Sequence, residues 1–185
     1  MTGRLVLVVG PSGAGKDSLL RHARTALHEC QDVLFPRRVI TRPADETEDH
    51  EPVSAAQFER LRSEGALAFY WQAHGLWYGV RIPVRAWVAA GGIAVVNVSR
   101  SLIAPLRAEY PVDAVEVTAP PEILSERLAL RGREVGQDIK QRLARSYDPQ
   151  TLQADAVIVN DGCLADAGVR LVAFILTRSI ASGAR

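Results

Sequence analysis

The sequence predicts an α/β fold in which a parallel sheet carries helices on both faces. Short apolar runs alternate with helical patterns along most of the chain. The runs are almost continuously apolar, which is typical of parallel strands that are buried on both sides. A glycine-rich turn follows the first run, and the ligands of such sheets bind at the carboxyl ends of the strands. We therefore expect the functional site to lie beside this turn.

The first strand is expected over 5–9, and the glycine-rich turn leads from it into a helix that reaches about residue 28. Strand, glycine-rich turn and helix, in this order, are the context of a P-loop, whose backbone N–H groups surround a polyphosphate. The lysine of the motif then reaches the β- and γ-phosphates. An ordinary strand-to-helix turn is the alternative interpretation. The predicted P-loop consists of Gly10, Pro11, Ser12, Gly13, Ala14, Gly15, Lys16, Asp17 and Ser18.

Asp17 departs from the P-loop pattern, which expects a serine or threonine that binds Mg²⁺ directly after the lysine. Ser18 follows one position late. A carboxylate beside a triphosphate is repelled unless a cation lies between them, so Asp17 or Ser18 is predicted to face the metal. The alternative is an acidic residue favoured in the first turn of a helix by the macrodipole.

The middle of the chain is expected to form a small inserted lobe. A polar loop over 41–51 follows the apolar positions within 33–40, and it is either a substrate-binding segment or a solvated charge run. Ser54 and Gln57 form a capping-box pattern that opens a short helix. Weak alternation on both sides of Gly75 then predicts a hairpin, whose aromatic residues form the core of the lobe.

From Pro83 onward the chain returns to regular alternation of helix and strand. The pattern predicts a helix ending at Gly91, a helix that begins near Pro121, and a terminal helix after Asp161. Residues Leu164, Ala167, Leu171, Ile175 and Ile180 are expected to face inward from the terminal helix. The other expected elements are a strand over 93–98, a helix over 101–110, a strand over 114–118 and a buried strand over 156–160.

Length and composition bound the class of protein. The 185 residues, 48% hydrophobic and 23% charged, suit a single globular domain. The net charge of +1 provides no general attraction to nucleic acid or to membranes. Cys30 and Cys163 lack the spacing of a metal or redox site, and no signal peptide or bilayer-spanning run is found. We expect a cytoplasmic protein that acts on small molecules, without nucleic-acid or membrane partners.

Several stretches together resemble the guanylate kinase family. GPSGAGK, ITRP, HGLWYGV, APPEILSERLALRGRE and VIVND occur in the order and spacing of that family, so the resemblance covers nearly the whole chain. It implies a P-loop NTPase fold with a core of 1–36 and 83–185, a substrate lobe at about 37–82 and a lid at about 131–141. It also implies that ATP and Mg²⁺ bind at the P-loop. Arg131 and Arg142 would then close onto the transferring phosphoryl group, with Arg133 as a weaker candidate.

The residues that read guanine in that family are absent here. Arg38 stands in place of a small hydroxyl residue, Phe69 in place of a glutamate, and Val80 in place of a second hydroxyl residue. Each unpaired polar edge in a dry pocket costs about 1–3 kcal/mol, so GMP is a poor acceptor for this chain. Arg42 and Tyr78 match two of the residues that hold the acceptor phosphate. The added Arg38 favours an acceptor with a second anionic group instead of a base.

This pattern, together with Asp17 in GKDS and the unit WQAHGLWYGV, resembles the ribose 1,5-bisphosphate phosphokinases of phosphonate breakdown. Members of that family use ATP to phosphorylate the 1-phosphate of α-D-ribose 1,5-bisphosphate, which yields 5-phosphoribosyl 1-diphosphate and ADP. The resemblance implies that basic and phenolic side chains grip the acceptor phosphates, and that smaller polar side chains meet the ribose hydroxyls. The first group is Arg38, Arg42 and Tyr78, and the second is His50, Asn97 and Ser99.

Three alternatives stay open at this point. A guanylate kinase or another small-molecule kinase of the same fold would share the P-loop. A catalytically silent guanylate kinase-like module that recognises phosphopeptides would have no use for Gly13, Gly15 and Lys16. A GTPase switch would need an NKxD-type guanine reader, and Asn160-Asp161 lacks the lysine and the spacing.

Overall fold

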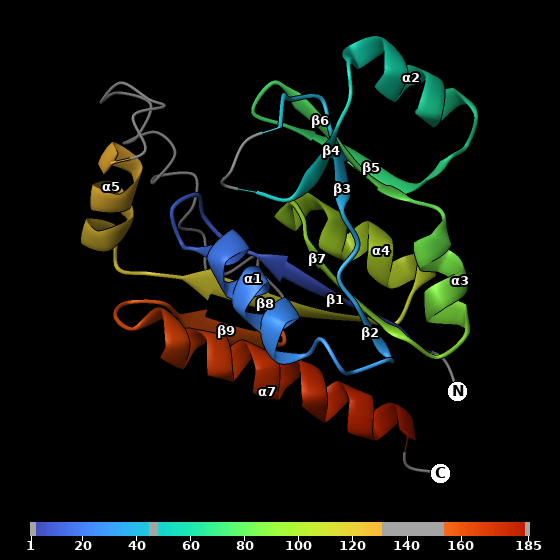
Figure 1. Ribbon diagram of the computed structural model, residues 1–185. Coiled ribbons are helices and arrows are strands. Elements are labelled where there is room, and N and C mark those ends of the chain that lie inside the picture. Colours follow the sequence, from blue (N-terminus) through green and yellow to red (C-terminus); the bar gives the residue numbers. More distant parts are fainter. Residues whose placement is uncertain (1–2, 45–47, 131–153, 184–185) are drawn as a thin grey trace.

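The computed structural model describes residues 3–44, 48–130 and 154–183, arranged around two sheets (Figure 1). The larger sheet has five strands in the order β2-β7-β1-β8-β9, and every pairing between neighbours is parallel. This confirms the predicted parallel sheet. Its strands are β1 (Arg4–Val9), β2 (Val33–Leu34), β7 (Ile93–Asn97), β8 (Val112–Thr118) and β9 (Ala156–Val159).

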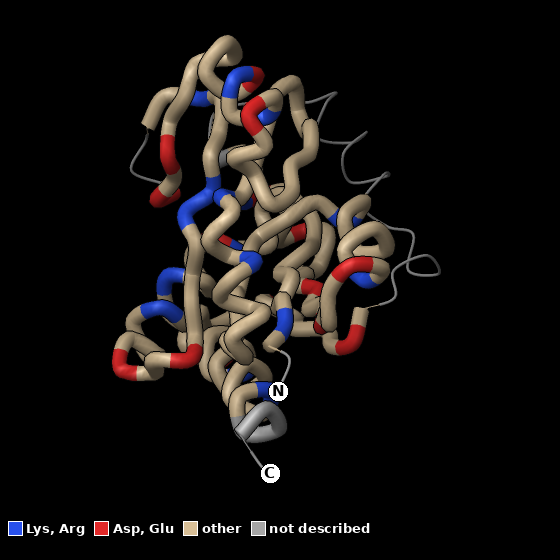
Figure 2. The backbone as a smooth tube through the Cα atoms, turned by 90° about the vertical axis from the view of Figure 1, so that its right-hand side faces the viewer, with Lys and Arg blue, Asp and Glu red and all other residues tan. Residues whose placement is uncertain are grey.

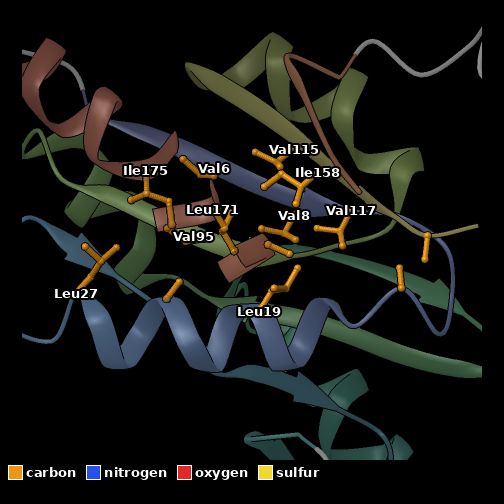
Figure 3. Close-up of a cluster of buried hydrophobic side chains, with 14 of the residues drawn as sticks. Val6, Val8, Leu19, Leu27, Val95, Val115, Val117, Ile158, Leu171 and Ile175 are labelled. Atoms are coloured by element: carbon orange, nitrogen blue, oxygen red, sulfur yellow. The ribbon is translucent and has the colours of Figure 1, made fainter. Parts of the chain in front are cut away.

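Strand β1 is the centre of the core, and its side chains alternate between two apolar clusters. Val6 and Val8 pack with Leu19 of one helix and Leu171 of another, as Figure 3 shows. Leu5, Leu7 and Val9 belong to the cluster on the opposite face. Because successive side chains of a strand point to opposite faces, an unbroken apolar strand needs a covering layer on each side.

Helices supply both layers, as the sequence predicts. α1 and α7 contribute to the cluster around Val6 and Val8, whereas α3 and α4 contribute to the cluster around Leu5 and Leu7. No helix within the described ranges is long and apolar enough to cross a bilayer. The bounds are α1 (Lys16–Ala26), α3 (Pro83–Ala89), the 3₁₀ turn η1 (Arg100–Leu102), α4 (Ile103–Glu109), α5 (Pro121–Leu130) and α7 (Leu164–Gly183).

Strand β9 corrects one expectation. The apolar run 156–160 predicts a buried strand, but Val157 is 58% exposed and Val159 is 38% exposed, while Ile158 between them is buried. β9 forms the edge of the larger sheet, so only one of its faces packs on the core in the described part of the chain. A short apolar run does not reveal whether its second face has a covering layer.

The smaller sheet forms with α2 the part of the molecule drawn above the larger sheet in Figure 1. The capping box is confirmed, because the Ser54 hydroxyl accepts from the Gln57 N–H at 3.2 Å and the Gln57 side chain accepts from the Ser54 N–H at 2.7 Å. Phe58 of α2 stacks on Trp77 with ring centroids 5.7 Å apart. The elements are β4 (His50–Pro52), β3 (Arg38–Ile40), β6 (Leu76–Arg81), β5 (Leu67–Ala73) and α2 (Ala55–Ser63).

The second sheet lies within residues 38–81, where the sequence predicts the substrate lobe of 37–82. It contacts the core through Phe69, Trp71 and Val80, which share an apolar cluster with Leu5 of β1. The division into core and substrate lobe stays a prediction, and the predicted lid at 131–141 lies outside the described residues.

Candidate active site

The turn between β1 and α1 follows the backbone path expected of a P-loop. Gly10 has φ 139°, and a Cβ atom there would lie 1.9 Å from the carbonyl oxygen of Val117 on β8. Gly13 and Gly15 have φ values of 85° and 87°. Residues with side chains rarely adopt such angles, and no side chain fits beside Val117. The glycines of the motif are therefore required by the course of the backbone itself.

Lys16 begins α1, and its side chain folds back over the turn. Its Nζ atom donates hydrogen bonds to the carbonyl oxygens of Gly10 at 2.9 Å and Pro11 at 2.8 Å. Gly15 is the N-cap of α1, so the positive end of the helix dipole lies at the same place. An ammonium group and a helix N-terminus lie together at this turn, which favours a bound polyphosphate.

Asn160, at the end of β9, supports the P-loop from the neighbouring strands. Its side chain is 2% exposed, and its Nδ2 donates to the carbonyl oxygen of Ala14 at 2.8 Å. A Cβ atom on Gly15 would lie 2.5 Å from the same Nδ2. Arg127 of α5 donates to the backbone oxygen of Asn160 at 3.1 Å. The amide thus holds the middle of the loop against the sheet.

Asp17 connects the P-loop helix to the rest of the site. Its Oδ1 atom accepts a hydrogen bond from Nδ2 of Asn97 at 2.8 Å and lies 3.4 Å from Nη2 of Arg38. Arg38 also donates from Nη1 to the backbone oxygen of Asn97 at 2.9 Å. Side chains from α1, β3 and β7 therefore meet at a single carboxylate.

Glu48 holds two arginines of the predicted acceptor site together. Its Oε1 atom accepts from Nη2 of Arg38, and its Oε2 atom accepts from Nη2 of Arg42 at 3.2 Å. The exposed fractions of the Arg38, Arg42 and Glu48 side chains are only 11%, 23% and 11%. Charges this poorly hydrated must be paired, and a bridging carboxylate shows that two guanidinium groups converge on one anion position.

Tyr78 forms the wall beside these arginines. Its ring stacks on Trp71 with centroids 5.3 Å apart, and the Arg38 guanidinium lies 5.7 Å from its ring centroid. Burial raises the pKa of the Tyr78 phenol above its ordinary value of 10.0, against the opposing effect of Arg38 and Arg42. The hydroxyl therefore keeps its proton at neutral pH and can donate a hydrogen bond to an anion.

A pocket adjoins this network between α1 and β3. Acidic and basic positions are interspersed along the described chain (Figure 2), and the pocket combines both kinds. Such a mixture suits a small, doubly charged ligand that can exchange places with protein carboxylates. The charged lining residues are Asp17, Arg21, Arg24, Arg38, Glu48 and Asp49.

Comparison with solved structures supports the fold. A guanylate kinase from Anaplasma phagocytophilum superposes with a TM-score of 0.67, covering 95% of this chain and 86% of that chain at 20% sequence identity. This likeness confirms the predicted P-loop NTPase fold of the guanylate kinase type. No family model matches the chain.

Comparison of sequences decides the family. A ribose 1,5-bisphosphate phosphokinase PhnN from Acidiphilium cryptum is 50% identical over 175 residues, which cover 95% of this chain and 93% of that protein. The chain belongs to the ribose 1,5-bisphosphate phosphokinase family. Proteins of the same name from Pseudofrankia inefficax and Methylobacterium radiotolerans are 47% and 46% identical, over 94% and 95% of this chain and 91% and 98% of those proteins.

In this phosphokinase most of the predicted acceptor residues lie in one network. Ser18 follows Asp17 in the first turn of α1, next to that network. Arg131, Arg133 and Arg142 lie outside the described residues. The residues brought together are Asp17, Arg38, Arg42, Tyr78 and Asn97.

His50 and Ser99 of the phosphokinase have other partners than the ribose hydroxyls expected for them. His50 is 2% exposed, and its ring nitrogens lie 3.1 Å from the backbone oxygen of Glu48 and 3.2 Å from that of Arg42. It therefore ties the ends of the 42–50 segment, and this arrangement does not support a ribose contact. Ser99 accepts at its hydroxyl from Ser101 and caps η1.

Two side chains that contact the P-loop or the predicted acceptor arginines were not among the residues expected from the sequence. Glu48 reads as one more charge in the polar loop 41–51, and nothing in its local pattern marks it as a partner of Arg38 and Arg42. Asn160 lies in the VIVND stretch that carries the family resemblance. A polar residue at the carboxyl end of an apolar strand is the sequence feature that could have indicated its place in the site.

Proposed function

We propose that the protein transfers the γ-phosphoryl group of ATP to the 1-phosphate of ribose 1,5-bisphosphate, giving 5-phosphoribosyl 1-diphosphate and ADP. The observation that carries this proposal is the contact between Asp17 and Arg38. It places an arginine that can bind an anion directly beside the P-loop. Membership of the family supports the same acceptor.

The wall that would have to read a purine is apolar. Phe69 is 7% exposed and Val80 is fully buried, and both belong to an apolar cluster with Trp71. Neither can accept the hydrogen bonds that a guanine edge requires, and an unpaired polar edge is costly in a dry site. The acceptor that fits is one with phosphates and no base.

The proposed reaction needs little covalent help from the protein. The second pKa of a phosphate lies near ~6, so the attacking oxygen of the 1-phosphate is largely ionised at neutral pH and no general base is required. A bond forms between this oxygen and the γ-phosphorus while the bond to the β–γ bridging oxygen breaks, and the electron pair leaves with ADP. Catalysis then consists of positioning and neutralising charge, for which Lys16, Arg131 and Arg142 are the proposed residues.

Mg²⁺ is proposed to bind at the start of α1. Asp17 and Ser18 offer the oxygen ligands that this hard cation prefers. Asn97 and Arg38 both contact Oδ1 of Asp17, so Oδ2 is the oxygen that we propose for the metal or one of its waters. The ion would supply charge neutralisation between the β- and γ-phosphates. No group of three or more His, Cys, Asp or Glu side chains poised for a metal occurs among the described residues.

An acceptor panel tests the proposal. The purified protein is incubated with ATP, Mg²⁺ and either ribose 1,5-bisphosphate, GMP or gluconate, and both ADP and the phosphorylated product are measured. We expect turnover with the bisphosphate and at most a trace with the other two. Efficient phosphorylation of GMP would instead identify a guanylate kinase, and turnover of gluconate would identify a sugar-acid kinase. We further propose that the reaction takes place in the cytoplasm with small-molecule partners alone.

A further inference from the structure

The pocket beside the Asp17–Arg38 contact extends along one face of α1. Asp17, Leu20, Arg21 and Arg24 all line it, and their spacing of three, four and seven residues places them in one row on the helix. Because α1 begins at the P-loop, this row leads from the phosphate cradle outward. Arg24 lies about 10 Å beyond Asp17 along the helix axis.

The two ends of this row are chemically distinct. At the inner end Arg38 lies 3.4 Å from Asp17 of the P-loop. A phosphate bound by Arg38 would therefore lie next to the P-loop. At the outer end Arg24 donates to Oδ2 of Asp49 at 2.7 Å and to the backbone oxygen of Phe35 at 3.3 Å. In ribose 1,5-bisphosphate the chain O1, C1, ring oxygen, C4, C5 and O5 separates the two phosphorus atoms, so its two phosphates lie apart and can reach two different groups of arginines.

The pocket also has apolar lining. Leu20, Phe35 and Val95 line it together with the charged residues, and the Arg24 guanidinium lies 5.9 Å from the Phe35 ring centroid. The apolar side chains offer contact to the C–H groups of a sugar and none of the polar atoms that a base would need. A ligand with two anionic groups joined by a sugar fits a pocket with this lining.

Asp49 marks the outer end as an anion position. Its carboxylate bridges Arg24, at 2.7 Å, and Nε of Arg37, also at 2.7 Å. The hydrogen bond from Arg24 holds the pKa of Asp49 below its ordinary value of 3.8. The Asp49 side chain is 52% exposed, so it can turn into solvent when a stronger anion arrives. A phosphate dianion carries more charge and more acceptor oxygens than a carboxylate.

From this geometry we infer that Arg24, with Arg21 beside it, binds the non-reacting 5-phosphate of the acceptor at the outer end of the α1 pocket. The inference rests on the proposed function, since it assigns a place to the second phosphate of that substrate. Arg38 and Arg42 then hold the reacting 1-phosphate, and the ribose lies across Leu20 and Phe35.

Ligand truncation combined with mutation tests the inference. ADP and Mg²⁺ fill the P-loop, and dissociation constants are measured by calorimetry for ribose 1,5-bisphosphate and for ribose 1-phosphate, which lacks the 5-phosphate. Arg24→Gln should weaken binding of the bisphosphate about tenfold or more and leave ribose 1-phosphate unchanged, because a hydrogen bond to a charged group is lost only with the former. Arg21→Gln should act in the same direction.

Arg60→Gln is the matched control, because Arg60 is an exposed arginine on α2 whose Nε donates to Glu64 at 2.7 Å. It should bind both ligands like the wild type. Equal weakening of both ligands by Arg24→Gln, or none, would overturn the site. If the wild-type protein does not bind the bisphosphate, the proposed function is rejected. If it binds the bisphosphate more tightly than ribose 1-phosphate, and Arg24→Gln and Arg21→Gln do not change this preference, only the Arg24 site is rejected.

Discussion

The side-chain amide of Asn97 donates a hydrogen bond of 2.8 Å to the carboxylate of Asp17. This contact joins the carboxyl end of β7 to the first turn of α1, and Arg38 adds a second link to the same oxygen. Asp17 is therefore more than a charge placed favourably in a helix dipole. It connects the P-loop to Arg38 of the proposed acceptor site, and these contacts are a physical reason for an aspartate at this position of the motif.

Lys16→Ala should lower kcat by several orders of magnitude and leave the fold intact. The ammonium group lies over the turn on the carbonyl oxygens of Gly10 and Pro11, where it can neutralise charge that grows during transfer. Initial rates with ribose 1,5-bisphosphate, together with circular dichroism and a thermal melt, check both parts. A variant that remains active would favour the silent binding module over an enzyme.

Arg38→Ser should raise the KM for the bisphosphate and cost about 1.5–3 kcal/mol in kcat/KM. The change removes a partly buried guanidinium that contacts Asp17, Glu48 and the backbone of Asn97. It also restores the small hydroxyl side chain expected of a guanine-binding relative, so GMP serves as the comparison acceptor. Kinetics equal to those of the wild type would remove Arg38 from the acceptor clamp.

Glu48→Gln should make the protein less stable and yet bind the acceptor more tightly. Loss of the bridging charge removes the carboxylate that Arg38 and Arg42 share, which should cost about 1–3 kcal/mol of the free energy of unfolding. The same loss removes an anion that competes with the acceptor phosphate, so the KM should fall severalfold.

For the stability part of this prediction Asp49→Asn is the control, since Asp49 also bridges two arginines but is 52% exposed. Urea unfolding should place its stability within about 1 kcal/mol of the wild type. A KM that rises in Glu48→Gln would show instead that Glu48 holds the arginines in position for the substrate.

The stability of the lobe should depend on pH through Glu51. The hydrogen bond from Arg81, at 3.2 Å from Nε, and the charge of that residue hold the pKa of Glu51 below its ordinary value of 4.5. A lowered pKa means that the folded state binds its proton only at lower pH than the unfolded state. The contribution is therefore present above pH 4.5 and is lost as the pH falls through the lowered value.

Glu51→Gln isolates this contribution. Both side chains of the pair are more than a third exposed, so the wild type should exceed the variant by less than about 1 kcal/mol at pH 7. Urea unfolding at pH 7, 4.5 and 3 should show this difference shrinking toward zero at the lowest pH. A difference that stays constant with pH would assign the effect to packing.

Local features of the fold were predictable from the sequence because neighbouring residues determine them. The P-loop depends on the glycines between β1 and α1, and the capping box depends on Ser54 and Gln57, which are three residues apart. The buried face of α1 follows from the spacing of Leu19 and Ala23. Each of these features can be read in a window of a few residues.

Contacts between distant segments could not be predicted in this way. Asp17 and Asn97 are 80 residues apart, and they meet only because β1 and β7 pair in parallel with Val8 opposite Asn97. Glu48 contacts Arg38 because β3 pairs with β4. The residue pattern of the polar loop does not predict this pairing. The exposure of Val157 likewise depends on the edge position of β9 in the sheet.

Asp17→Asn decides between two roles of the irregular P-loop residue. If the carboxylate helps to bind Mg²⁺, the amide should raise the metal concentration needed for half-maximal rate, because a charged oxygen ligand or a partner of a metal-bound water is lost. If Asp17 only complements the helix dipole and Arg38, the variant should lose about 0.3–1 kcal/mol of stability with unchanged metal dependence. Mg²⁺ titrations at saturating ATP, paired with a denaturant melt, separate these outcomes.

Asn97→Ala is the matched control, since it removes the 2.8 Å hydrogen bond to Asp17 and keeps the carboxylate. An unshifted Mg²⁺ curve in Asp17→Asn would reject the metal role and leave Ser18 as the ligand.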